Sequence, residues 1–159
     1  MKHFLILISL AVSLGACATL DPQPDQVAGT TALAPVVTPS FQEPIDLLPE
    51  VTGPLSWRIT TGSLEAQAYF DQGFQLRFAY GVDEAARSFR EAHEADPTCA
   101  MCYWGEAFAL GSYLNGGMTV EKAPYALAAI RRAAELAETN ATAMEKDLIE
   151  ATAVRYVEG

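Results

Sequence analysis

The chain has 159 residues, of which 50% are hydrophobic and 19% charged, and its 20 Asp and Glu against 10 Lys and Arg give a formal net charge of −10 at pH 7. This length suits one small folded domain, whose hydrophobic core is only just large enough to stabilise it. So acidic a chain repels phosphate backbones and anionic lipid, which disfavours nucleic-acid binding and makes protein or peptide partners, including a second copy, the expected ones.

The N-terminus predicts export. Lys2 precedes an apolar run from Phe4 to Val12, which is short for a bilayer span but suits the apolar core of a signal peptide. The run ends at Leu14-Gly15-Ala16-Cys17, which resembles the lipobox of bacterial lipoproteins. That resemblance implies cleavage of a signal peptide at residues 1–16 and lipidation of Cys17. Ala18 then favours the periplasmic face of the outer membrane, with the lipid as the only membrane contact. The alternative is an ordinary signal with an incidental cysteine.

Residues 17–54 are predicted to form a tether, because prolines recur too densely for a helix. The short apolar patch 45–48 within it either docks on the folded domain or has no role. Residues 55–61 alternate β-branched and aromatic side chains with polar ones, which predicts a short extended segment that packs on the domain. The prolines of the tether are Pro22, Pro24, Pro35, Pro39, Pro44, Pro49 and Pro54.

Five helices are expected after this segment. Ser63 is the predicted N-cap of the first, Asp96-Pro97 begins the third, Pro124 lies in the first turn of the fourth, and Asn140 caps the fifth. The expected ranges are about 64–79, 83–95, 97–112, 122–138 and 141–156.

Residues 69–76 and 103–110 share one pattern of aromatic, small, Phe and Leu residues 34 positions apart. Small and large residues alternate after the first copy, as expected where two helices cross closely. The pattern recurs after the second copy with a longer loop between its helices. A period of this length predicts a solenoid of helix-turn-helix units. The two matching sets are Gly73, Ala85, Phe89, Ala92 and Pro97, and Ala126, Ile130 and Ala133.

This pattern resembles the tetratricopeptide repeat (TPR). The segments 66–73, 85–92 and 96–105 look like those of bacterial TPR proteins of unassigned role, over about residues 55–156. The resemblance implies an all-α domain at 55–159, with repeats at about 66–99 and 100–140 and an extra helix at 141–156. That helix is either a natural cap or a sign that the chain is a truncated subunit of a larger TPR assembly. No catalytic residue comes with the resemblance, so we expect no enzyme.

In TPR arrays the first helix of each repeat lines a concave groove. By register, the resemblance places eight side chains in a partner-binding groove rich in aromatic residues, with Gly111 at its end. The alternative is that the lead-in segment or the enlarged loop fills the groove, so that the aromatic residues are core. Aromatic residues stand where relatives that grip a C-terminal carboxylate carry Lys and Asn, which disfavours that mode. The eight are Gln67, Phe70, Phe74, Arg77, Phe78, Met101, Trp104 and Phe108.

Cys99 and Cys102 lie three positions apart at an expected helix start. They suit a structural disulfide or a pair of buried thiols in an exported protein, and they leave open a periplasmic thiol/redox role. A metal or haem role is disfavoured because His93, the only histidine after the signal, is expected at the surface of another helix. We expect no metal or other cofactor, and a membrane-anchored adaptor is the preferred function.

Overall fold

The computed structural model describes residues 40–50 and 52–157. The predicted signal peptide, the lipidation site Cys17 and most of the tether lie outside these residues. The described chain forms five helices and no strand, which confirms the all-α fold class. The helices are α1 (Leu64–Phe78), α2 (Val82–Ala95), α3 (Ala100–Leu110), α4 (Ala123–Asn140) and α5 (Ala143–Ala153).

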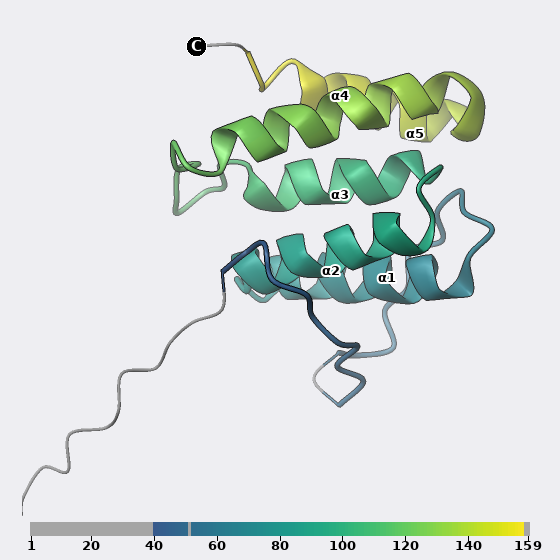
Figure 1. The fold of residues 1–159 in the computed structure, drawn as a ribbon, viewed down its shortest axis with the longest axis vertical. Coiled ribbons are helices and arrows are strands. Elements are labelled where there is room, and N and C mark those ends of the chain that lie inside the picture. The colour runs from purple at the N-terminus through teal and green to yellow at the C-terminus, as the bar shows by residue number, and fades with distance from the viewer. Residues whose placement is uncertain (1–39, 51, 158–159) are drawn as a thin grey trace, which may run out of the picture. The chain divides into compact units, whose positions relative to one another are not determined.

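The helices pack in chain order. Helix α1 packs against α2, α2 against α3, α3 against α4, and α4 against α5. Figure 1 shows α3 between the α1–α2 pair and α4. Helix α3 also contacts α1 and α5, so alternate helices touch along one side of the stack. Helix α5 therefore meets α3 and α4 in the way that α3 meets α1 and α2.

The crossings depend on glycine and alanine. Phe89 of α2 is fully buried, and a Cβ added to Gly73 or Gly105 would lie 3.0 Å or 2.2 Å from its ring. Both glycines therefore let a neighbouring helix come close to Phe89. Alanines flank the ring on α2, and the matching residues of α4 are buried as well. These are Ala85, Ala92, Ala126, Ile130 and Ala133. The repeated small and large residues are thus core positions.

The start of α1 agrees with the prediction, whereas the starts of α5 and α3 differ from it. Ser63 caps α1, since its hydroxyl accepts from the amide of Ala66 at 3.1 Å. Asn140, however, is the last residue of α4 and does not cap α5. The cap is Thr142, which forms a capping box with Glu145 and so satisfies two backbone amides at once.

Helix α3 begins at Ala100 rather than directly after Asp96. The carboxylate of Asp96 accepts from the amide of Thr98 at 3.0 Å and from the hydroxyl of Thr61 at 2.5 Å. These bonds hold residues 96–98 in a turn and delay the helix.

The folded part begins earlier than residue 55. Phe41 and Ile45 are buried, with 4% and 9% of their surface exposed. The guanidinium of Arg87 donates to the carbonyls of Glu43 and Pro44. The end of the predicted tether is therefore packed on α2, and of the two readings of the patch 45–48 the structure shows docking. The boundary predicted at 54/55 is wrong because these contacts join residues more than forty positions apart.

Candidate functional site

The face formed by α1 and α3 carries all eight predicted groove residues, but the structure divides it in two. The near half, toward the start of both helices, is covered by the lead-in segment around Trp57 and Ile59. The distal half, at the end of both helices, holds Arg77, Phe78 and Phe108 and is partly open. Phe74 lies between them, 5.1 Å from the ring of Trp57 and 5.0 Å from that of Phe78.

In the near half, side chains of α1 hold the backbone of the lead-in segment. The amide of Gln67 donates to the carbonyl of Trp57 at 2.9 Å and accepts from the backbone amide of Ile59 at 3.1 Å. Asp71 accepts from the backbone amide of Trp57 at 2.9 Å and from the hydroxyl of Ser56 at 2.6 Å. Apart from the Ser56 hydroxyl, these contacts use backbone groups, which any extended chain offers.

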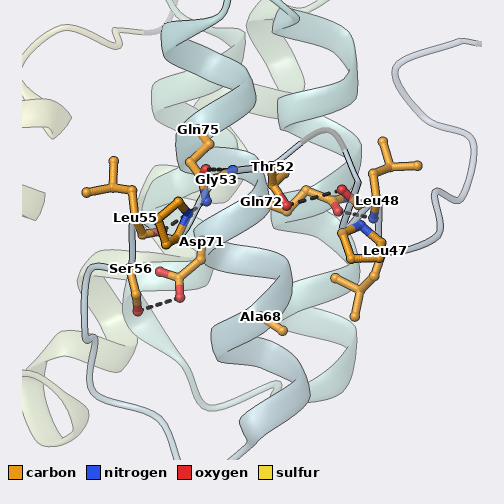
Figure 2. Close-up of a pocket in the computed structure, with 12 residues that line it drawn as sticks. Leu47, Leu48, Thr52, Gly53, Leu55, Ser56, Ala68, Asp71, Gln72 and Gln75 are labelled. Carbon is orange, nitrogen blue, oxygen red and sulfur yellow. Dashed lines mark hydrogen bonds between the residues drawn. The ribbon is translucent and has the colours of Figure 1, made fainter.

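Two further glutamines repeat this arrangement. Gln75 accepts from the amide of Gly53 at 2.6 Å and donates to the carbonyl of Leu55 at 2.9 Å. Gln72 accepts from the amide of Leu48 at 2.6 Å and donates to the carbonyl of Asp46 at 3.0 Å. Figure 2 shows Asp71, Gln72 and Gln75 reaching from α1 to this segment, around a hollow of about 290 Å³.

Trp57 closes the near half. Its ring meets those of Phe70 and Trp104 edge-on, with centroids 5.8 Å away in both cases. Phe70 is fully buried and Trp104 is 3% exposed. The indole N–H of Trp104 donates to the hydroxyl of Thr152 on α5 at 2.8 Å. The edge-on rings and this hydrogen bond make the near half a packed core.

The prediction that all eight groove residues face a partner is therefore wrong. Phe70, Met101 and Trp104 are core residues, and the amide of Gln67 is used by the lead-in segment. Gly111 is also packed, since a Cβ there would lie 2.2 Å from the hydroxyl of Tyr156. The alternative in which the lead-in segment fills the groove holds for the near half only.

The distal half is a pocket of about 260 Å³, which we call the aromatic pocket. Three of its side chains are largely exposed: Phe78 at 65%, Tyr80 at 62% and Leu114 at 96%. Exposed apolar residues gathered at one site are typical of an interaction surface. The pocket is lined by Arg77, Phe78, Tyr80, Phe108, Ser112, Tyr113 and Leu114.

Sequence reasoning missed Tyr80, Tyr113 and Leu114, which lie outside the helices. Tyr80 follows α1, and the other two belong to the loop between α3 and α4, where Tyr113 and Gly116 pair through their backbones. The length of the loop between α3 and α4 was the available signal. This length left open whether the loop fills the groove, and in the structure its residues Tyr113 and Leu114 line the aromatic pocket.

Tyr80 holds an unusual backbone conformation. Its φ of 66° lies in the left-handed region, where glycine is favoured. The amide of Gly81 donates to the carbonyl of Leu76 at 2.9 Å, and that of Tyr80 to Arg77 at 3.4 Å. This is the Schellman ending of a helix, with tyrosine where glycine is usual. It places the Tyr80 ring 6.2 Å from that of Tyr113, at the rim of the pocket.

Arg77 forms the buried wall of the pocket and is only 7% exposed. Its guanidinium lies over the rings of Phe108 and Tyr113, 5.1 Å and 4.7 Å from their centroids. Its hydrogen bond is a long one, 3.5 Å from Nε to the carbonyl of Phe108. Burial lowers the pKa of Arg77, and the nearby charge of Arg155 lowers it further.

A second polar cluster lies between α2 and α3. Glu106, 5% exposed, accepts from Arg90 and lies 2.9 Å from the ring nitrogen of His93. His93 stacks on Tyr103, with centroids 4.2 Å apart. Burial opposes ionisation of Glu106, but His93 and Arg90 outweigh it and bring its pKa below the ordinary value. The expectation that His93 is an ordinary surface residue is wrong, because it pairs with a buried acid.

Cys99 and Cys102 form a disulfide at the start of α3. The two residues are 1% and 0% exposed, and Sγ of Cys99 accepts from the amide of Cys102 at 3.1 Å. Because thiol exchange requires access to a sulfur atom, this arrangement suits a structural bridge.

Within residues 40–50 and 52–157, no group of three or more His, Cys, Asp or Glu side chains could hold a metal ion. The helices of the same residues include none with the length and apolarity needed to cross a membrane. Comparison of the chain with protein-family models, curated proteins and solved structures gives no match. A function therefore has to follow from the geometry of the two halves of the groove.

Proposed function

We propose that this protein is a TPR-like interaction module that binds an extended apolar segment of a partner protein in the aromatic pocket. In this proposal α1–α2 and α3–α4 are the two repeats, and α5 occupies the place of the first helix of a following repeat. Cys17 tethers the module by its lipid to the periplasmic face of the outer membrane, where the module acts as an adaptor without catalysis.

The proposal rests on the hydrogen bonds by which α1 holds an extended segment of its own chain. Gln67, Gln72 and Gln75 each use both ends of one amide to hold an extended backbone. Trp57 supplies the apolar anchor among aromatic rings. Gln67 lies on the same face of α1 as Phe70 and Phe74, and the row of aromatic rings on this face continues from Phe74 to Phe78 and Phe108. Aromatic anchors in a partly enclosed groove are the usual basis of peptide recognition.

A selection from displayed random peptides tests this proposal. Peptides retained by the wild-type chain should be apolar, and Phe78→Ala should abolish their binding. Leu64→Ala is the matched control, because Leu64 is 91% exposed on the same helix but lies at its other end. Failure to enrich peptides, or equal loss with both variants, would refute peptide binding at this site.

Self-association is a second candidate, because the side of α5 away from the core exposes apolar residues. Met144 is 68% exposed, and Val154 and Val157 beyond it are 76% and 80% exposed. A second copy or another TPR subunit could cover them. Sedimentation of the full chain tests this candidate: a concentration-dependent dimer that Val154→Asp abolishes supports it, and a monomer at all concentrations refutes it.

A further inference from the structure

The aromatic pocket contains a positive charge that nothing in the described chain neutralises. Arg77 is 7% exposed, yet none of the ion pairs that the structure describes among residues 40–50 and 52–157 includes its guanidinium. Burying a charge without a partner costs free energy. The two aromatic rings that flank Arg77 offset part of this cost, since a cation over a ring is attracted to its face.

The surroundings of Arg77 favour an anion. The titratable groups that act on it are the phenols of Tyr113, Tyr156 and Tyr80 and a second cation, Arg155. Arg155 donates to the carbonyl of Ser112 at 2.7 Å, and Ser112 itself lines the pocket. Two cations thus lie at one small site of a chain whose net charge is −10. That overall charge repels a polyanion, so a ligand with one negative charge fits this site best.

The size and lining of the pocket limit the ligand further. A volume of about 260 Å³ is below the range of about 300–1,000 Å³ typical of pockets for drug-sized molecules. It suits one or two amino-acid side chains. Phe78, Tyr80 and Leu114 at the rim provide apolar contacts around a charged floor. An acidic side chain with apolar neighbours in the sequence matches both features.

We infer that the aromatic pocket recognises a single Asp or Glu carboxylate of the partner segment, flanked by apolar residues and bound by the guanidinium of Arg77. This inference rests on the proposed function and adds the chemistry of the partner to it. Arginine suits the role because its planar fork can donate two parallel hydrogen bonds to one carboxylate. The rings of Phe108 and Tyr113 keep that fork in place before the ligand arrives.

The test compares two peptides that differ only in charge, acetyl-Leu-Glu-Phe-Leu-amide and acetyl-Leu-Gln-Phe-Leu-amide. Calorimetric titration of the full chain should show the Glu peptide binding at least about tenfold more tightly, as expected for hydrogen bonds to a charged group. Arg77→Gln should remove the preference and Arg77→Lys should retain part of it. Because Arg77 is buried, helical circular dichroism checks that both variants fold, and the comparison of peptides on the wild-type chain does not depend on them.

Equal binding of the two peptides, lost with Phe78→Ala, would overturn the carboxylate inference and leave the proposed peptide function standing. Failure of both peptides to bind the wild-type chain would also overturn the inference, while the selection from random peptides tests the function independently. Stronger binding of the Glu peptide that survives Arg77→Gln in a folded variant would place the carboxylate elsewhere and refute the role of Arg77.

Discussion

Two replacements of Tyr80 distinguish what this residue contributes to the stability of the fold from what it contributes to binding. The residue has φ of 66° at the Schellman ending of α1, and its side chain is 62% exposed at the rim of the aromatic pocket. Tyr80→Ala removes the ring but keeps a Cβ in the left-handed conformation. Tyr80→Gly removes both. The difference between the two variants therefore reports the backbone, and their common loss reports the ring.

A side chain in the left-handed conformation costs about 1–2 kcal/mol. Glycine avoids this cost, but its greater freedom in the unfolded chain lowers the stability of the fold by about 0.4–1 kcal/mol. The Gly variant should thus be more stable than the Ala variant by roughly 1 kcal/mol, or a few degrees in Tm. The ring contact with Tyr113, at 6.2 Å, contributes about 0.5–1.5 kcal/mol, and both variants lose it.

Thermal unfolding followed by circular dichroism measures the difference, and titration with the Glu peptide measures the function. Both variants should lose peptide affinity to the same extent. A Gly variant less stable than the Ala variant would show that Tyr80 is not held in the left-handed region. Full affinity in both variants would show that this tyrosine has no part in binding, leaving its backbone strain without a functional reason.

Four other predictions concern the rest of the chain. Trp57→Ala should lower the free energy of unfolding by about 3 kcal/mol, because it leaves a cavity among Phe70, Phe74 and Trp104; an unchanged urea midpoint would contradict the packed near half. Replacing Cys99 and Cys102 together by Ala should cost about 2 kcal/mol from loss of a short closed loop, whereas reductase or isomerase turnover by the wild-type chain would support the redox alternative. Burial opposes ionisation of Glu106 and Glu145, but their hydrogen-bond partners outweigh it and bring both pKa values below the ordinary 4.5. The stabilisation by these two carboxylates should therefore be complete above about pH 4.5 and be lost as the pH falls through their lower folded pKa values. A Tm that stays level between pH 5 and pH 3 would contradict this. Cys17→Ser should release the protein from the membrane fraction or block its maturation, and unchanged fractionation would refute the lipid anchor.

The core could be predicted from the sequence because its signals are local and repeated. Gly73, Phe89 and Ala92 follow the spacing that a close helix crossing requires, and the structure buries all three. The N-cap of α5 could have been predicted too. Thr142 and Glu145 form the Thr-x-x-Glu pattern of a capping box, which outweighs a lone Asn140 because it satisfies two amides.

The occupant of the groove could not be predicted, since helix periodicity places Phe70 and Phe78 on one face but does not tell what covers them. That depends on contacts across long sequence separations, such as that of Trp57 with Trp104. The pairing of His93 with Glu106 is hidden for the same reason, because the two residues lie on different helices.

Amide chemical shifts of the full chain, recorded while the Glu peptide is added, test most directly that the open binding site is the distal half of the groove. We predict saturable shifts at residues 77–81 and 108–114, around Arg77, Tyr80 and Leu114. The amides of residues 57–67, where Trp57 is packed against the near half, should stay unchanged. Saturable shifts centred on the near half, or none at any residue, would contradict the account.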